Sequence, residues 1–242
     1  MVNGIKKSLF YKNMSKKIKF INMLNVNEMY YPKPAETILP EWYKKTNSYI
    51  GEKKKPSGTG TTTATIKRCI PVFDAISAGY IIKSPADLYV SQKDGELWFE
   101  WASMDLISFH PITQAEFHPL KNEYEYPKWN NPWGIKTAPG YSCLFVQPFH
   151  RESKFTIFPG IVDTDTYSAQ VNFPFVMNDN QWEGLIPAGT PIAQVIPFKR
   201  DSFKMELGNQ INIQESKSIT SKLRTRFFDS YKNQFWQRKE YK

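Results

Sequence analysis

The chain has 242 residues, of which 40% are hydrophobic, 15% aromatic and 23% charged. This composition excludes a globally disordered protein and allows one large domain or two small ones. No stretch approaches the roughly 18 uninterrupted apolar residues that a membrane-spanning helix needs, and the first residues lack the apolar run of a secretion signal. We therefore expect a protein that is not exported by a signal peptide and does not bind a membrane.

The charge is uneven along the chain. Lys and Arg outnumber Asp and Glu by 32 to 23, yet residues 1–60 carry +8, residues 199–242 carry +6 and residues 61–198 carry −5. Basic groups confined to the two ends favour solubility or docking on an acidic partner over nucleic-acid binding, which needs basic groups among the base-reading side chains. Cys69 and Cys143 are the only cysteines, a pattern that indicates neither a disulfide framework nor a zinc site.

The first 63 residues predict a basic N-terminal arm and linker packed on the body. Residues 1–16 are rich in Lys and predict an arm, and residues 18–21 predict a first strand. The Tyr-Pro-Lys-Pro sequence at residues 31–34 argues against regular structure, because each proline fixes φ and restricts its predecessor. Residues 39–44 predict a short helix with Pro40 near its first turn. Residues 51–63 are polar and contain glycine, which predicts a flexible loop.

Residues 64–200 predict one mainly β domain. Short apolar runs, separated by Pro and Gly, are typical of all-β sandwiches and barrels. The predicted strands are residues 65–72, 79–82, 87–90, 97–101, 141–146, 155–158, 171–176 and 192–198. No sustained helical period occurs between residues 64 and 198, so we expect no helix there.

Residues 201–242 predict a basic amphipathic helix. From about Ser218, apolar residues recur every four positions with basic residues between them: Ile219, Leu223, Phe227, Tyr231 and Phe235. We expect the helix to dock on its own domain or on a neighbouring subunit. Burial of Phe227 and Phe235, rather than the charge of Arg224 and Lys232, would then supply its contribution to stability.

Two motifs carry a family resemblance. Residues 158–167 (FPGIVDTDTY) lead through the predicted strand at 171–177 to residues 186–196 (IPAGTPIAQVI). This order resembles the dUTP pyrophosphatase and dCTP deaminase superfamily, in which a G-[VI]-[IV]-D-x-D-Y hairpin precedes an I-x-x-G-x-x-[IV]-A-Q-[LV] strand. The resemblance implies a dUTPase-like β-barrel or sandwich, and a homotrimer with sites between subunits.

A second resemblance covers residues 66–200. The sequences RCIP at 68–71, AGY at 78–80, APGYS at 138–142 and GIVDTD at 160–165 are similar to the signature of an uncharacterised family of tailed bacteriophages and some bacteria. It implies a phage-type protein of the host cytoplasm or the virion, and it implies no particular reaction.

The hairpin supplies the first candidate site residues. In the pyrophosphatases the first Asp of the hairpin activates the attacking water, and an aromatic residue after the second Asp stacks on the deoxyribose. Asp163 matches the first role and is the candidate catalytic residue, whereas Asp165 is followed by Thr166, with Tyr167 one place late. We expect Asp163 to lie in a cleft, and Gly160 to have a positive φ that lets the chain turn tightly.

The other chemical motifs of that superfamily are eroded. Its phosphate-binding P-R-S turn corresponds to residues 147–153, where Arg151 and Ser153 are separated by Glu152, whose charge repels a phosphate. The metal-binding A-G-x-D-L motif is interrupted, and the Gly-rich C-terminal arm is replaced by the predicted helix. A magnesium ion is therefore implied only if the protein is an enzyme, and we assign no metal ligands. His110 and His118 match no compact metal motif.

Two further residues complete the candidate site. Residues 129–134 predict a loop carrying two Trp, and Trp133 could stack on a base or a sugar. The resemblance also places Gln194 near the ligand. The candidate ligand-binding residues are Asp163, Asp165, Tyr167, Arg151, Ser153, Trp133 and Gln194.

Three functions follow from these observations. The first is a phage-type non-catalytic binding or assembly protein, either a virion component or a module that sequesters a nucleotide-like ligand. The second is a nucleotide pyrophosphohydrolase or deaminase that uses Asp163 and Arg151, and the third is nucleic-acid binding through the basic termini. The expected partners are a second copy, another phage protein or acidic protein, and a nucleotide-like small molecule.

Overall fold

The computed structural model describes residues 16–52, 63–102, 104–120, 125–225 and 230–242. Most of the predicted arm at residues 1–16, most of the predicted loop at residues 51–63, and Phe227 lie outside the described residues. Across the described ranges, no helix combines the length and the apolar character that crossing a membrane requires.

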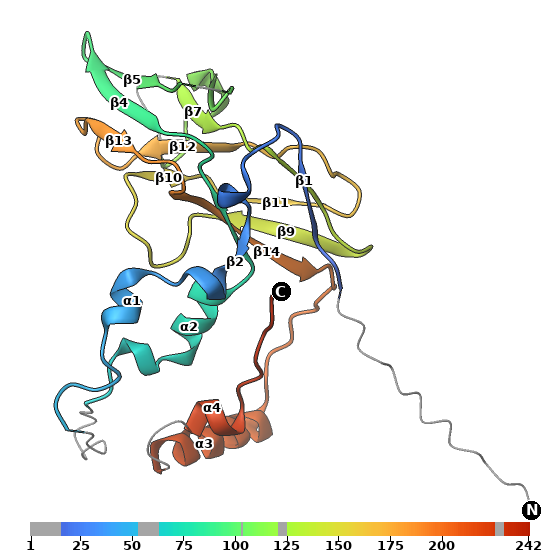
Figure 1. Ribbon diagram of the computed structural model, residues 1–242. Helices are drawn as coiled ribbons and strands as arrows, with labels where there is room; N and C mark the ends of the chain where they lie inside the picture. Colours follow the sequence, from blue (N-terminus) through green and yellow to red (C-terminus); the bar gives the residue numbers. More distant parts are fainter. Residues whose placement is uncertain (1–15, 53–62, 103, 121–124, 226–229) are drawn as a thin grey trace, which may run out of the picture.

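The described strands form four antiparallel sheets (Figure 1), which confirms the mainly β prediction. The five-stranded sheet has the order β11 (Gly160–Val162), β9 (Tyr141–Val146), β14 (Pro191–Lys199), β3 (Tyr80–Lys83) and β2 (Lys33–Pro34). The four-stranded sheet has the order β10 (Phe155–Ile157), β12 (Phe173–Met177), β7 (Tyr126–Trp129) and β6 (Ile107–His110). The three-stranded sheet has the order β13 (Gly184–Ile186), β4 (Leu88–Lys93) and β5 (Glu96–Glu100), and β1 (Lys19–Asn22) pairs with β8 (Trp133–Lys136).

None of these sheets closes on itself within the described ranges, so the expected barrel is replaced by open sheets around one core. The five-stranded sheet ends at β2, a two-residue strand whose second residue is Pro34. Proline has no N–H to donate to a further strand, so it suits a sheet edge. The sequence predicts no regular structure at residues 31–34. This prediction is wrong for Lys33 and Pro34, which form β2.

Aromatic side chains dominate the core. Trp129, Phe155 and Phe175 are each at most 1% exposed, and their ring centroids lie 5.3 to 5.4 Å apart. The predicted aromatic loop at residues 129–134 is shortened to residues 130–132 and does not present its two Trp side chains, because Trp129 ends β7, Trp133 begins β8 and both are buried. The buried Asn131 side chain bonds both backbone groups of Trp133, at 3.0 and 3.2 Å, and so closes the tight connection between the strands.

The predicted strand at residues 65–72 is wrong. This segment forms a 3-10 helix, Ile66–Arg68, and then helix α2, Ile70–Ser77. The Thr65 side chain accepts from the backbone N–H of Lys67 at the helix start, and Pro71 lies in the first turn of α2, where no N–H is needed. The apolar residues here are spaced for a helix, but eight residues are too few to show a sustained period.

The other predicted elements are confirmed, with shifts of one to three residues at their ends. Residues 18–21 form β1, residues 39–44 give helix α1 (Glu41–Lys45), and the remaining seven predicted strands correspond to β3, β4, β5, β9, β10, β12 and β14. Short 3-10 helices lie at Glu28–Tyr30, Ala35–Ile38 and Ile112–Gln114. Five strands were not among the predicted ones: β6, β7, β8, β11 and β13. Pro127 in β7, Gly134 in β8 and Gly160 in β11 look like loop residues.

The C-terminal helical segment consists of α3 (Gln210–Thr225) and α4 (Ser230–Gln234), so helix formation begins well before Ser218. Three of its described apolar side chains lie outside the core, because Ile219, Tyr231 and Phe235 are each 42% exposed, while Leu223 is half-buried. Figure 1 shows both helices standing apart from the sheets. The expected burial of Phe235 is therefore wrong, and the side chain of Arg224 lies outside the described residues.

The last seven residues return to the body instead. Trp236 donates from its indole nitrogen to both carboxylate oxygens of Asp74 at 3.0 Å, and Lys239 pairs with the same carboxylate at 2.6 Å. The ring of Tyr241 packs edge-on against Tyr80, with the centroids 6.0 Å apart. The last seven residues are thus anchored on α2 and β3. The helices α3 and α4 lie in a segment that is held on the body at both of its ends, by Arg200 and by Trp236.

Candidate functional site

The predicted hairpin turns directly after β11. The backbone carbonyl of Asp163 accepts from the N–H groups of Thr166 and Tyr167 at 3.0 and 2.8 Å. Thr164 is fully buried, and its hydroxyl lies 2.9 Å from that of Thr137. The turn places the side chains of Asp163 and Asp165, on either side of Thr164, where both contact Arg200.

Arg200 holds both carboxylates. It donates to Asp165 through both terminal nitrogens, pairs with Asp163 at 3.1 Å and donates to the Ser142 hydroxyl at 3.1 Å. Ser142 in turn donates to Asp163 at 2.6 Å, and the backbone N–H of Gly140 donates to Asp165 at 2.8 Å. These residues, Ser142, Asp163, Asp165 and Arg200, form the Arg200 cluster.

Sequence reasoning missed Arg200 and Ser142. Only the pairing of β14 with β9 indicates them. In this pairing Lys199 lies opposite Tyr141, so Arg200, the residue after β14, lies close to Ser142. The glycine with positive φ at this site is Gly140, at 80°, rather than Gly160. The expectation for Gly160 is therefore wrong, and a Cβ added there would meet no heavy atom within 4 Å.

Arg200 also controls the acid behaviour of this cluster. The side-chain hydrogen bond from Arg200, followed by the Gly140 N–H, lowers the pKa of Asp165 from its ordinary 3.8 to about 2. A lowered pKa means that the fold favours the ionised form. The contribution of this carboxylate to stability is therefore present above the ordinary pKa and is lost as the pH falls toward 2.

We expect Asp165→Asn to flatten the acid side of the stability profile. The melting temperature of the wild type should fall more steeply than that of Asp165→Asn between about pH 5 and pH 2, because only the wild type must protonate a paired carboxylate. Thermal melts by circular dichroism across this range measure the difference. Asp201→Asn, which changes an exposed carboxylate paired with Lys199, is the control, and equal slopes for wild type and Asp165→Asn would contradict the expectation.

The cluster does not fit a divalent metal ion. Both oxygens of Asp165 already accept from Arg200, so the guanidinium occupies the position between the two carboxylates that a cation would take. No group of three or more His, Cys, Asp or Glu side chains within the described ranges could hold a metal ion. His118 stacks on Phe158 with the ring centroids 4.4 Å apart, which is a packing contact.

The expected phosphate-binding residues are engaged elsewhere. The guanidinium of Arg151 donates to the backbone carbonyl of Ile38 in the N-terminal segment, and burial lowers its pKa. The hydroxyl of Ser153 accepts from the backbone N–H of Phe155 at 3.2 Å. The indole of Trp42 donates to the His150 carbonyl at 2.6 Å. The turn at residues 147–153 thus holds the N-terminal segment, and Arg151 is not directed at the hairpin.

Gln194 is fully buried, and its amide is bonded within the protein. Its oxygen accepts from the Phe149 N–H at 3.0 Å, and its nitrogen donates to the carbonyls of Ala75 and Ala78 at 2.9 and 2.7 Å. The side chain therefore ties β14 to α2 and to the 147–153 turn. The expected ligand contact at Gln194 is replaced by this internal role, and Trp133 is likewise enclosed in the core.

Gln194→Leu is expected to lower the free energy of unfolding by about 3 kcal/mol, because it leaves three backbone groups without their partner in a buried place. Urea denaturation measures the loss. Gln92→Leu is the matched control, since Gln92 makes one exposed hydrogen bond to Asn180 and its loss should cost less than about 1 kcal/mol. Equal losses for the two variants would contradict the structural role of Gln194.

Tyr167 remains accessible. Its side chain is 51% exposed, and its hydroxyl donates to the Gln170 carbonyl at 3.3 Å. Of the seven expected ligand-binding residues, the structure thus brings Asp163 and Asp165 together, with Tyr167 in the same turn. Arg151, Ser153, Trp133 and Gln194 make other contacts.

A second site lies between β5 and β6. It is a groove of about 600 Å³ lined by six apolar side chains and two carboxylates, which we call the aromatic groove: Glu96, Leu97, Trp98, Phe99, Trp101, Phe109, Ile112 and Glu125. β5 and β6 are edge strands of two different sheets. Trp98 is 47% exposed and Phe109 is 43% exposed, while Phe99 forms the floor at 8%.

Phe99 connects this groove to the core. Its ring centroid lies 6.1 Å from that of Phe109 and 6.0 Å from that of the fully buried Phe175. On the outer side, the Lys93 amine lies 4.5 Å from the Trp98 ring centroid. The exposed ring of Phe109 therefore packs on Phe99, which is itself fixed to the core. Side chains that are already ordered lose less conformational entropy when a partner binds them.

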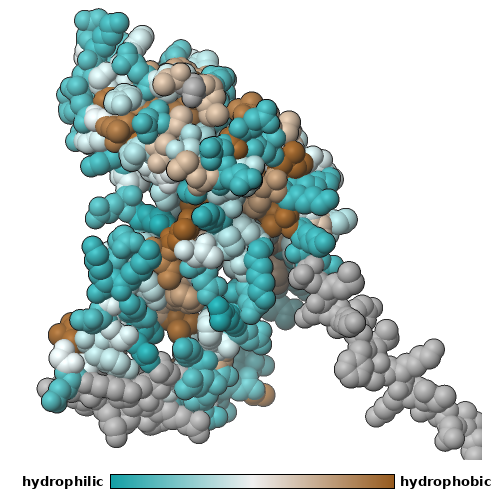
Figure 2. Space-filling model, viewed as in Figure 1, coloured by the Kyte–Doolittle hydropathy of each residue, from teal (hydrophilic) through white to brown (hydrophobic). Residues whose placement is uncertain are grey.

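The charge around the groove is strongly negative. The described residues between 87 and 125 hold seven carboxylates and one lysine, a net charge of −6, whereas residues 61–198 as a whole carry −5. Figure 2 shows hydrophobic patches among hydrophilic residues at this end of the molecule. Sequence reasoning missed the groove, because β6 was not recognised and the acidic charge was averaged over residues 61–198.

Comparison with known proteins gives little beyond this geometry. No protein-family model and no curated protein matches the chain. Among solved structures, a mutant dUTPase from phage phi11 of S. aureus, described with a structural Mg(II) ion, is similar over 81% of this chain and 99% of that chain, with 9% identity and a TM-score of 0.34. A likeness this small carries no argument about activity or partners.

Proposed function

We propose that the protein acts by binding another protein rather than by catalysis, as an assembly component of the phage type that the sequence resemblance implies. The observation that carries the proposal is the aromatic groove, in which Trp98 and Phe109 stand exposed on a floor fixed to the core. Exposed aromatic rings on a rigid base are typical of the residues that dominate binding energy at protein interfaces.

The rim of the groove favours a basic, apolar partner. Glu96 and Glu125 line it, and the described lining contains no Lys or Arg. Carboxylates repel the phosphates of a nucleotide or a nucleic acid and attract Lys and Arg side chains. Sequestration of a nucleotide-like ligand and nucleic-acid binding are therefore disfavoured at this groove.

Nucleotide hydrolysis or deamination at Asp163 remains the second candidate. Its side chain is 62% exposed, and Ser142 and Arg200 fix its orientation. An accessible, oriented carboxylate is suited to positioning a water molecule. However, Arg151, the expected phosphate ligand, is directed to the N-terminal segment.

Nucleotide turnover separates the two candidates. We expect incubation with dUTP, dCTP or the ribonucleoside triphosphates and magnesium to release no more pyrophosphate or ammonia than Asp163→Ala releases. Asp201→Ala is the matched control, because it removes an exposed carboxylate outside the Arg200 cluster. Turnover that Asp163→Ala abolishes and Asp201→Ala preserves would replace the binding proposal with the enzyme.

A further inference from the structure

We infer that the segment between Arg200 and Trp236 of one copy binds in the aromatic groove of a second copy, so that the copies associate head to tail. This inference rests on the proposed function and names the partner. We call the described residues 201–225 and 230–235 the C-terminal arm.

The arm begins with an exposed apolar stripe. Phe203, Met205 and Leu207 are 93%, 86% and 91% exposed, and residues 201–209 form no helix or strand. In an extended chain alternate residues share a face, so these three side chains can point to one side, with Lys204 and Glu206 on the other. Three large apolar side chains presented in this way are suited to burial against a partner.

Both ends of the arm are held on the body. Before it, Arg200 is bound to Asp165 and Asp163, and after it, Trp236 and Lys239 are bound to Asp74. The arm therefore leaves the body after Arg200 and rejoins it at Trp236. These contacts keep the arm near its own body and leave Phe203, Met205 and Leu207 exposed.

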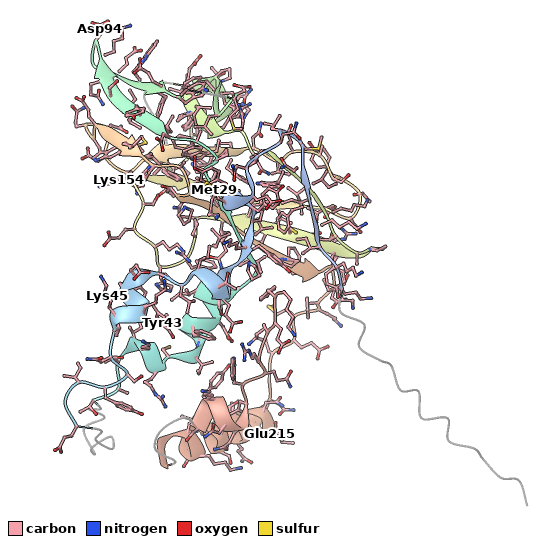
Figure 3. The ribbon with its side chains drawn as sticks, viewed as in Figure 1. Met29, Tyr43, Lys45, Asp94, Lys154 and Glu215 are labelled. Carbon is pink, nitrogen blue, oxygen red and sulfur yellow. The ribbon has the colours of Figure 1, made fainter. Side chains whose placement is uncertain are left out.

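The charges of arm and groove are complementary. The positive charge lies in the helical part of the arm: residues 208–225 and 230–235 hold four basic residues and one acidic residue, a net charge of +3, against −6 for residues 87–125. Residues 202–207, which hold one Lys and one Glu, contribute apolar side chains rather than charge. Figure 3 labels Asp94, at the tip between β4 and β5, and Glu215, on α3, at opposite ends of the molecule. Figure 1 shows the chain from the end of β14 to α3 leading away from β5, so the groove that the arm can fill is that of another copy.

The strand edges support the same arrangement. β5 and β6 each have a neighbour on one side only in the described sheets, so their outer edges are available to pair with an extended segment. Residues 202–207 can lie along such an edge, with backbone hydrogen bonds giving affinity and the aromatic groove accepting alternate side chains. Because arm and groove are different surfaces, this interface is heterologous and generates a ring or an open chain of copies.

Sedimentation velocity of the full chain tests the inference. We expect the wild type to associate reversibly between roughly 1 and 200 µM. Two variants, Trp98→Ala with Phe109→Ser in the groove and Phe203→Ser with Met205→Ser and Leu207→Ser in the arm, should each weaken association at least about tenfold. Ile161→Ser, which changes a side chain 64% exposed on β11, should associate as the wild type does. Urea midpoints confirm that each variant is folded.

Mixing the two variants is the sharper measurement. Each retains one intact half of the interface, so an equimolar mixture should form a heterodimer and stop at two copies. Glu96→Lys with Glu125→Lys should weaken association as the groove variant does, because it reverses the charge of the rim.

Three results would overturn the inference: a monomeric wild type throughout, an arm variant that associates like the wild type, or a mixture without the heterodimer. Association that survives the arm variant but is lost on deletion of residues 1–15 would assign the groove to the N-terminal segment instead. The failure of the proposed function is a different result, namely Asp163-dependent nucleotide turnover. The two failures are therefore distinguishable.

Discussion

Gly79→Ala is expected to lower the free energy of unfolding by about 4 kcal/mol or more. Gly79 has φ +66°, and a Cβ added there would lie 2.0 Å from the Val195 carbonyl oxygen and 2.8 Å from its carbon. Val195 cannot move away, because it pairs with Tyr80 in β3 and with Phe145 in β9 at the centre of the five-stranded sheet. The substitution therefore combines an unfavourable φ with a backbone collision.

Two other glycines separate these causes. Gly140 has φ +80° but open space around its Cβ position, so Gly140→Ala should cost about 1 kcal/mol from φ alone. Gly160 has neither a positive φ nor a close neighbour, so Gly160→Ala should change stability by less than about 0.5 kcal/mol. Chemical denaturation of the three variants measures the series. A loss for Gly79→Ala no larger than that for Gly140→Ala would show that β14 can yield.

Phe175→Ala is expected to cost about 4 kcal/mol, because it leaves a cavity at the most aromatic part of the core. Phe175 is fully buried, and its ring centroid lies 5.4 Å from those of Trp129 and Phe155 and 6.0 Å from that of Phe99. These rings come from four different strands, so they cannot all close on the space left behind.

Phe203→Ala is the matched control for that loss. It removes the same side chain from a position that is 93% exposed, so stability should change by less than about 0.5 kcal/mol. Urea denaturation at low protein concentration compares the two variants without contributions from association. A small loss for Phe175→Ala would mean that the aromatic core repacks around the deletion.

The local elements of this protein follow from its sequence to a large extent. Short apolar runs between Pro and Gly are sufficient for the mainly β architecture, and the family resemblance at residues 160–165 indicates the turn that carries Asp163. These features depend on backbone preference and on the period of apolar residues, which act over a few neighbouring positions. The uneven charge of the chain is likewise a property of sequence alone.

Helix α2 shows the limit of this reasoning at short range. Its eight residues are too few for a period to stand out, and contacts with distant segments contribute to the choice of helix over strand. One such contact is the carbonyl of Ala75 in α2, which accepts from Gln194 in β14.

The sites were decided by the tertiary structure. Arg200 meets Asp163 and Asp165 because β14 and β11 pair with the same strand, a register that local sequence does not specify. The aromatic groove needs side chains of edge strands from two different sheets to meet, and the exposure of the C-terminal arm depends on anchors at Arg200 and Trp236. Sequence determines which side chains are available, whereas the packing of sheets decides which of them meet, because such contacts join residues far apart in the chain.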